Sequence, residues 1–247
     1  MARFHASAAI APAAGPYGTP QAVRQPVLAN FASLEPRVEP ALQPPLQRLR
    51  AWEEHAFAAL TPQFAGRLAG GRVRECHGDL HLGNLVLHRG RIEAFDCLEF
   101  NPALRWIDVI SDLAFLVMDL QQRGHPEFAT LLLNRWLELS GDYAGLRLWC
   151  WYSVYRALVR AKVAALGDQP DAVRAYVDRA LAVSSARPRV LLLCHGLSGS
   201  GKSHHSAGLL APLGAIRLRS DVERKRLFGL WGDATERPAA ATSTPRP

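Results

Sequence analysis

The residues best suited to chemistry form one short stretch in the first half of the chain. It opens with His77-Gly78-Asp79, and Asn84 follows five positions after that aspartate. A second aspartate, Asp96, stands a little further along. This set of groups suits phosphoryl transfer, in which one aspartate accepts the proton of the substrate hydroxyl while an asparagine and a second aspartate hold Mg²⁺ on the phosphates.

Two short apolar runs separate the asparagine from the second aspartate. They are Leu85–His88 and Ile92–Phe95, and a glycine stands in the short turn between them. A glycine between two such runs predicts a tight hairpin. We therefore expect Asp79, Asn84 and Asp96 to converge on one pocket, close enough to share bound Mg²⁺.

A resemblance to the aminoglycoside phosphotransferase-like kinases rests on two blocks of this stretch, HGDLHLGN and FDCLEF. The loop of that family carries a second histidine where His81 stands. The resemblance implies that Asp79 is the catalytic base, with His77 and His81 beside it in the catalytic loop. It also implies that Asn84 and Asp96 are the metal ligands.

A third block downstream concerns the support of this loop. Asp112-Leu113-Ala114 is similar to an Asp-Leu-Ala of the same family, which implies that Asp112 braces the loop. The alternative for the whole stretch is that His77, Asp79 and His81 are ordinary loop residues that close a strand. Four polar residue types in register around a hairpin favour the catalytic interpretation.

A second motif with phosphate chemistry lies near the end of the chain. Val190–Cys194 is a continuously apolar run that suits a buried parallel strand, and a helix is expected at Ser203–Leu210. Between them the pattern G-x-x-x-x-G-K-S is met at every position, by Gly196, Leu197, Ser198, Gly199, Ser200, Gly201, Lys202 and Ser203. In this motif backbone N–H groups surround phosphate oxygens, the lysine reaches the β- and γ-phosphates, and the serine hydroxyl binds Mg²⁺. The alternative is a linker rich in glycine and serine that matches by chance.

A second short strand is expected at Ala215–Leu218, before Arg219-Ser220-Asp221 and a basic helix. This order resembles the small P-loop kinases of the gluconate- and shikimate-kinase type, in which an aspartate after the second strand faces the acceptor substrate or the metal. The resemblance implies a substrate role for Asp221, with Arg219 as a candidate beside it. The alternative is that Asp221 is only the N-cap of the next helix.

The two motif sets in this order resemble bacterial bifunctional proteins described as aminoglycoside phosphotransferase-like plus ATP-binding, the second module being a P-loop unit of the AAA type. The resemblance covers residues 31–230. It implies ATP and Mg²⁺ as cofactors and a small molecule with a hydroxyl group as the acceptor. The function that the motifs predict is ATP-dependent phosphoryl transfer.

Hydrophobic periodicity predicts a mostly helical α+β protein. Apolar residues recur at helical spacing, so helices are expected within 49–60, 106–120, 126–140, 144–166 and 171–183. The helix at 106–120 is apolar on most sides and carries Asp108 and Asp112 on one face, so both acids need partners. We expect a protein-kinase-like large lobe with a small hairpin, followed by a partial α/β P-loop unit.

Composition divides the chain into four parts. Residues 1–35 are rich in alanine, proline and glycine and are expected to form a disordered tail. The kinase-like large lobe is expected at 36–184 and the partial P-loop domain at 185–231. A second disordered tail is expected at 232–247, which has the composition of a disordered segment.

Charge and composition weaken several function classes. The formal charge is +7, from 29 Lys and Arg against 22 Asp and Glu, but it is spread along the chain, so a basic nucleic-acid-binding protein is the weaker alternative. The four cysteines show no CxxC spacing, which indicates neither a zinc site nor a disulfide framework. No apolar run approaches the roughly 20 residues that span a bilayer, and the N-terminus is a poor signal peptide. We expect a cytoplasmic protein without membrane contact.

Both phosphoryl-transfer modules are incomplete by sequence. A kinase-like enzyme uses a lysine in an N-terminal lobe, but the first lysine here is Lys162, well after Asp79. The P-loop segment offers only two predicted strands. We therefore expect a fragment of a longer two-kinase protein, truncated at both ends and impaired in activity, whose missing lobes flanking sequence would supply. The alternative function is a non-catalytic nucleotide-binding module.

Overall fold

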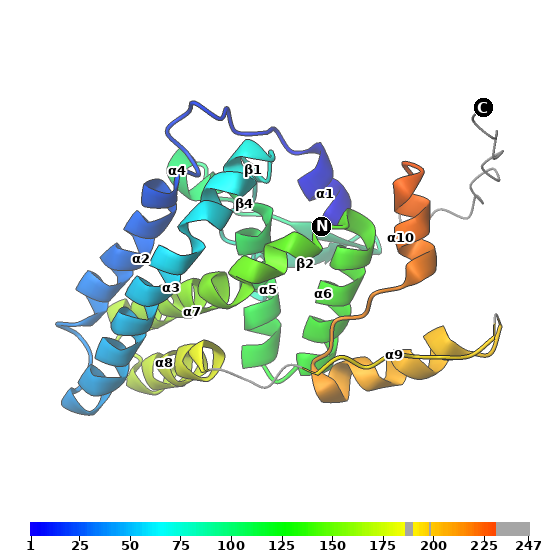
Figure 1. Cartoon of the computed structure of the whole chain (residues 1–247). Coiled ribbons are helices and arrows are strands. Elements are labelled where there is room, and N and C mark those ends of the chain that lie inside the picture. The colour runs from blue at the N-terminus through cyan, green and yellow to red at the C-terminus, as the bar shows by residue number, and fades with distance from the viewer. Residues whose placement is uncertain (186–189, 198, 231–247) are drawn as a thin grey trace.

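The computed structural model describes residues 1–185, 190–197 and 199–230. Most of this part of the chain is helical, and its strands are short (Figure 1). The α-helices are α1 (Ala2–Ser7), α2 (Pro20–Leu34), α3 (Gln43–Ala69), α4 (Pro102–Arg105), α5 (Val109–Gln122), α6 (Pro126–Ser140), α7 (Trp149–Leu166), α8 (Pro170–Ser184), α9 (Lys202–Leu213) and α10 (Ser220–Leu227). The 3₁₀ helices are η1 (Pro40–Leu42), η2 (Leu82–Asn84) and η3 (Tyr143–Leu148), and the strands are β1 (Val73–Glu75), β2 (Leu85–His88), β3 (Arg91–Ala94) and β4 (Trp106–Asp108).

Two antiparallel strand pairs border the predicted catalytic loop in the sequence. β1 pairs with β4, with Val73 opposite Asp108. β2 pairs with β3 as a hairpin, which confirms the predicted hairpin with its second strand displaced by one residue. Its turn holds Arg89 and Gly90 at φ values of +49° and +73°. These are the two left-handed residues that a type I′ turn requires.

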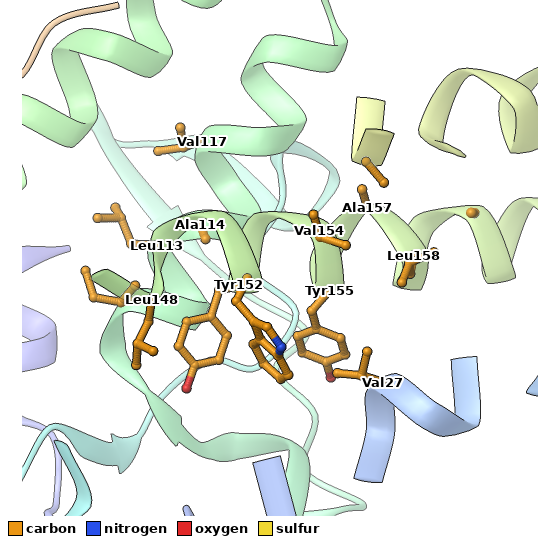
Figure 2. Packing of buried hydrophobic residues seen from close by; sticks show 14 of the residues in the cluster. Val27, Leu113, Ala114, Val117, Leu148, Tyr152, Val154, Tyr155, Ala157 and Leu158 are labelled. Atoms are coloured by element: carbon orange, nitrogen blue, oxygen red, sulfur yellow. The ribbon is translucent and has the colours of Figure 1, made fainter. Parts of the chain in front are cut away.

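The hydrophobic core is centred on α5 and α7. Helix α5 is buried continuously from Val109 to Asp119, as its apolar sequence predicts. Helix α7 contributes Trp151, whose ring lies edge-on to that of Phe64 from α3, with 4.9 Å between the ring centroids. Figure 2 shows Tyr155 of α7 pointing toward Val27 of α2. The core therefore joins helices from the beginning, middle and end of the first 185 residues.

The first 35 residues fold onto this core, so the expectation of a disordered tail at 1–35 is wrong. Helix α2 buries Val27, Phe31 and Leu34, whose spacing places them on one helix face. Thr19 caps the helix through its side-chain oxygen. Composition concealed this apolar stripe, because a count of alanines and prolines ignores the spacing of the large residues between them.

The long helices follow the predicted segments with one clear difference. α6 confirms the helix predicted at 126–140, and Gly141 at its C-cap has a φ of +70°. The helix expected at 49–60 does not end near Pro62 but continues to Ala69. Its last turn is retained because Arg67 is buried there and ion-paired.

The strands predicted at 190–194 and 215–218 do not form within the described ranges, so both predictions are wrong. A strand needs a hydrogen-bonding neighbour, and the leucines of the first segment lie exposed. The second segment docks instead on α6. There Asn134 Nδ2 donates to the carbonyl of Ala215 at 2.9 Å, and Asn134 Oδ1 accepts from the backbone N–H of Arg217 at 2.8 Å.

Three further expectations concern the whole chain. The tail predicted at 232–247 lies outside the described residues. Within the described ranges, no helix is both long enough and apolar enough to cross a membrane. All four cysteines lie within the described ranges and are free.

A buried guanidinium ties three segments of the core together. Arg67, in the last turn of α3, donates to both carboxylate oxygens of Asp108 and to both of Asp142. Asp108 also caps α5 by accepting from the backbone N–H of Ile110 at 3.0 Å. Burial would lower the pKa of Arg67, but the two carboxylates raise it overall. The arginine is therefore charged, and both aspartates depend on it for charge compensation.

Replacing this arginine tests how much that compensation contributes. We expect Arg67→Met to lower the free energy of unfolding by roughly 3–5 kcal/mol, because two buried carboxylates lose their partner. The matched control is Arg174→Met, which breaks an ion pair with Glu39 between half-exposed side chains and should cost less than about 1 kcal/mol. Urea denaturation measures both values, and equal losses would contradict the assigned role of Arg67.

Candidate active site

The predicted catalytic loop, residues 77–84, turns sharply at Gly78. The φ of this glycine is +86°, and a Cβ atom there would lie 2.5 Å from the carbonyl oxygen of Leu104 in α4. A side chain is therefore disfavoured both by backbone conformation and by contact. The glycine lets the start of the loop pack directly against the backbone of α4.

A carboxylate from α5 holds this turn. Asp112 is fully buried, and its Oδ1 accepts from the backbone N–H of Gly78 at 2.9 Å. Its Oδ2 accepts from the backbone N–H of His77 at 3.3 Å and from His5 Nε2 at 3.1 Å. The predicted bracing role of Asp112 is confirmed by these contacts.

His5 is a supporting residue that sequence reasoning missed. Trp136 Nε1 donates to His5 Nδ1 at 3.0 Å, and an indole N–H can only donate. Nδ1 is therefore an acceptor, so the hydrogen of the neutral imidazole lies on Nε2 and points at Asp112. The only sequence signal was indirect: a buried aspartate was expected to need a partner, but His5 lies in the segment assigned to a tail.

A second aspartate of the same helix holds the other end of the loop. Asp119 lies seven residues after Asp112, two helical turns along the same face, and is also buried. Its Oδ2 accepts from the backbone N–H of Leu82 at 2.9 Å and from Arg123 Nε at 3.1 Å. Arg156 of α7 adds a donor to the carbonyl of Gly78 at 2.9 Å. Neither Asp119 nor Arg156 was predicted.

The predicted base, Asp79, lies in this supported loop with two of its predicted neighbours. Its Oδ2 is 3.4 Å from His81 Nε2 and accepts from Asn84 Nδ2 at 3.2 Å. The Asn84 amide also donates to the backbone carbonyl of Asp79 at 2.9 Å. Burial raises the pKa of Asp79, but the hydrogen bond and charge of His81, the charge of Arg156 and the Asn84 amide lower it overall. The carboxylate is therefore ionised at neutral pH.

The first histidine of the loop joins it to the hairpin. His77 Nε2 lies 2.8 Å from the carbonyl oxygen of Phe95, at the end of the hairpin, so this nitrogen carries the hydrogen. His77 Nδ1 accepts from the backbone N–H of Asp79 at 3.3 Å. Both ring nitrogens are thus engaged with backbone groups, which gives His77 a positioning role in the described structure.

Asp96 follows the hairpin and is placed differently from the other predicted ligands. Its φ is +58°, and its side chain is exposed. The structure brings Asp79, His81 and Asn84 together, but it places no hydrogen bond or ion pair between Asp96 and a described residue. The predicted convergence of Asp96 with Asp79 and Asn84 on Mg²⁺ stays a prediction.

One set of three ligand-type side chains lies close together in the described part of the chain. The ligand atoms of His5, Cys76 and Asp112 are all within 4.8 Å of one another. Burial, with Asp112 nearby, raises the pKa of the Cys76 thiol and disfavours the thiolate that a metal needs. A metal on His5 Nε2 would also need an acceptor at Nδ1, where Trp136 places a donor. The set is a structural network rather than a metal site.

The P-loop motif forms a turn before α9. Gly196, Gly199 and Gly201 have positive φ values of +147°, +81° and +79°. Lys202 Nζ donates to the carbonyls of Gly196 and Leu197 at 2.7 and 2.6 Å. Of the other predicted phosphate-site residues, Ser200 lies in the turn, Ser203 lies in the first turn of α9, and Ser198 is outside the described residues.

The predicted substrate residues of the second motif have other partners. Asp221 Oδ1 accepts from Arg224 Nη2 at 2.7 Å within α10, and this hydrogen bond lowers the pKa of Asp221. The N-cap of α10 is Arg219 and not Asp221, so the alternative N-cap role is wrong. Arg219 lies 3.9 Å from Glu138 of α6. Among the described residues, no hydrogen bond or ion pair joins Asp221 or Arg219 to the P-loop turn.

Comparison with protein families bears directly on this arrangement. The model of the phosphotransferase enzyme family matches residues 1–149, more than half of the chain. The chain belongs to this family. A model described as an AAA domain matches residues 191–246. The chain thus joins a phosphotransferase domain to a P-loop domain in the order that the motifs implied, and the predicted α+β, mostly helical fold is confirmed.

Curated relatives extend the comparison without naming an activity. The uncharacterized proteins Mb2027c of Mycobacterium bovis and Rv2004c of Mycobacterium tuberculosis are each 37% identical to the chain over 171 residues. Each match covers 66% of this chain and 34% of the relative. The chain therefore spans about a third of the length of the curated relatives it matches. No solved structure matches it.

Asp112, which braces the catalytic loop, should make the stability of the protein depend on pH. Burial raises the pKa of Asp112, but His5, Arg156 and the Gly78 amide lower it overall. A lowered folded-state pKa contributes stability above the unfolded pKa of about 3.9, and this contribution is lost as the pH falls through the folded value.

An amide at this position removes that contribution. Asp112→Asn places an NH₂ group opposite the N–H of Gly78 or those of His77 and His5, so we expect a loss of about 3 kcal/mol near pH 7. Because wild-type Asp112 becomes protonated in acid, the difference should shrink below about pH 4. Urea denaturation as a function of pH measures it, with the exposed Asp178→Asn as control. A loss that is the same at every pH would mean that folding does not shift the pKa of Asp112.

Proposed function

We propose that the phosphotransferase domain transfers a phosphoryl group from ATP to the hydroxyl of a small molecule, assisted by Mg²⁺, with Asp79 as the base. Kinase-like domains of both matched kinds generally use ATP with Mg²⁺, and the family membership supports this class of chemistry. ATP as the donor suits a cytoplasmic location. The acceptor is proposed only as a class, because the fold does not specify it.

The carboxylate of Asp79 is the observation that carries the proposal. Its Oδ2 is held by His81 and Asn84. Its Oδ1 makes no hydrogen bond with another described residue, and the side chain is 29% exposed. A carboxylate with one oxygen fixed and the other open is suited to receive the hydrogen bond of an incoming hydroxyl.

The lowered pKa of Asp79 limits how it acts. An ionised carboxylate of low pKa is a weak base, so it contributes mainly by orienting the hydroxyl toward the phosphate and accepting its proton as transfer proceeds. In phosphoryl transfer most of the catalytic effect comes from positioning and charge neutralisation. The rigid support of the loop by Asp112 and Asp119 is consistent with that requirement.

The metal is proposed to lie on the hairpin side of Asp79. Asn84 uses its Nδ2 on Asp79, which leaves its amide oxygen without a partner among the described residues and available to a cation. The backbone of Phe95, next to Asp96, is hydrogen-bonded to Asn84 and to His77. We propose that Asn84 Oδ1 and the Asp96 carboxylate are the Mg²⁺ ligands, since hard oxygen ligands suit this ion.

The P-loop turn is proposed as a second phosphate site. Lys202 now donates to two carbonyls of its own loop, and a nucleotide would exchange these for phosphate oxygens. The first turn of α9 adds free backbone N–H groups, and Ser203 is the proposed Mg²⁺ ligand there. A non-catalytic nucleotide-binding module is the second candidate function. The local, contiguous character of this turn favours it, since binding would need no other part of the chain.

Asp79→Asn separates catalysis from binding. We expect acceptor-dependent release of ADP to fall by about 10²- to 10⁴-fold, the usual contribution of a general base, with the KM for ATP little changed. A coupled assay with saturating Mg²⁺ and ATP over a panel of small hydroxyl compounds measures this. Asp178→Asn is the control. Full activity in the Asp79→Asn variant would contradict the assignment of Asp79 as the base. No turnover of any acceptor by the unmodified chain would favour the non-catalytic module.

Lys202→Ala tests the P-loop separately. Removing one charge-assisted contact of roughly 1.5–3 kcal/mol should weaken nucleotide binding by at least about tenfold. Because the contact is to phosphate and not to the base, ATP and GTP should be affected alike. Calorimetric titration with and without Mg²⁺ measures both, with Lys162→Ala as the control. Binding that is unchanged in Lys202→Ala would mean that the motif does not hold the phosphates.

A further inference from the structure

A separate pocket lies away from both phosphate motifs. Its volume is about 300 Å³, and residues of α1, the end of α6, α10 and β1 contribute to its lining. The lining residues are Ala2, His5, Ala6, Arg72, Arg74, Val109, Trp136, Leu139, Ser140, Arg226, Gly229 and Leu230. None of residues 77–96 and none of 196–203 is among them. Three guanidinium groups therefore line a pocket to which no aspartate or glutamate contributes.

Two of these arginines lie two positions apart, Arg74 within β1 and Arg72 just before it. Because of this spacing, their side chains leave the same face of the strand. Val73 between them points the other way and is buried. Both arginines accordingly line the same pocket.

The charges of this pair are not neutralised by the protein. The side chain of Arg72 makes no hydrogen bond or ion pair with the described residues. Arg74 donates only to backbone carbonyls, those of Gly71, Ala6 and Ala8. Those bonds fix its guanidinium but leave its full charge. Two unneutralised positive charges that line one pocket favour a ligand that carries two negative charges.

The third arginine brings the P-loop segment to the same pocket. Arg226 of α10 donates to the carbonyls of Glu138 and Leu139 at the end of α6, at 2.8 and 3.3 Å, and is paired with Glu223. Its guanidinium packs on Gly141, where a Cβ atom would lie 2.6 Å from Arg226 Nε. The charge of Arg226 is already paired with Glu223, so this residue forms part of the pocket wall. Arg72 and Arg74 supply the electrostatic attraction for an anionic ligand.

The remaining walls set the size and character of the ligand. Ser140 Oγ accepts from the backbone N–H of Asp142, which leaves its hydrogen free to donate into the pocket. Val109, Leu139 and Leu230 are apolar, and both nitrogens of His5 are already engaged. A volume near 300 Å³ is at the lower end of small-molecule sites. It exceeds the needs of a lone inorganic anion.

We propose that this pocket binds a small organic phosphate, whose dianionic head is held by Arg72 and Arg74 and whose carbon part lies on the apolar wall. A phosphoryl group fits the planar forks of two arginines. The ligand would contact α1 and β1 of the phosphotransferase domain and α10 of the P-loop segment at once. Its binding should therefore fasten α10 onto the phosphotransferase domain.

The test uses phenyl phosphate as the probe, with inorganic phosphate for comparison. Calorimetric titrations are made on the full chain carrying Lys202→Ala, so that phosphate binding at the P-loop is weakened. We expect phenyl phosphate to bind more tightly than inorganic phosphate, and Arg72→Met to weaken it at least about tenfold. Ala6→Phe, which fills the pocket from an exposed position of α1, should have the same effect without changing any charge.

Arg48→Met is the control, because Arg48 is an exposed arginine outside the pocket. Hydrogen exchange gives a second readout. Phenyl phosphate should slow the exchange of the backbone amides of Val222–Phe228 in the chain that carries Lys202→Ala alone, and should not slow it when Arg72→Met is added. No binding at millimolar phenyl phosphate would overturn the proposal. So would equal affinity for the two probes, or equal weakening by Arg48→Met. Melting curves of each variant establish that it is folded.

Discussion

The arrangement of the candidate active site depends on one buried carboxylate. An ionised aspartate in a protein interior is costly unless its oxygens are hydrogen-bonded, and Asp112 receives its bonds from two backbone groups of the loop and from His5. The loop cannot move away without leaving that charge unpaired. The position of Asp79 is therefore fixed by the desolvation of a residue that does not take part in the proposed reaction.

The same reasoning applies along the whole of α5. Asp108, Asp112 and Asp119 are all buried, and each meets a different segment. Asp108 is paired with Arg67 from α3, Asp112 with the first turn of the loop, and Asp119 with its end at Leu82. An otherwise apolar helix in the core thus presents three buried carboxylates, one at its N-cap and two within it. Each carboxylate attaches a segment of chain that apolar packing alone would not orient.

The sequence alone was sufficient to predict those features of the structure that residues close together in the chain determine. The hairpin after Asn84 and the C-cap glycine of α6 follow from turn chemistry within a few residues, and both formed where predicted. The pairing of His81 and Asn84 with Asp79 agrees with a motif of short spacing. Such contacts join residues two to five positions apart, so a pattern in one sequence can reveal them.

Contacts between distant residues were not predictable in the same way. Nothing near His5 indicates that it faces Asp112, and nothing near Arg67 indicates two carboxylate partners from separate segments. The strands expected at 190–194 and 215–218 failed for a related reason, since a strand is defined by its neighbour and not by its own residues. Segment 215–217 has the neighbour Asn134, which satisfies its backbone from a helix.

The contacts of His5 also determine when the loop at residues 77–84 can take its final conformation during protein synthesis. Its partner Asp112 lies 107 positions later in the chain and its partner Trp136 lies 131 positions later. At synthesis rates of about 5–20 residues per second, helix α1 waits roughly 7–26 s after its own translation before Trp136 is made. Until then the imidazole lacks the donor that fixes its tautomer. The loop around Asp79 therefore reaches its final geometry only after Trp136 has been translated, and a ribosome that pauses before α6 would delay it.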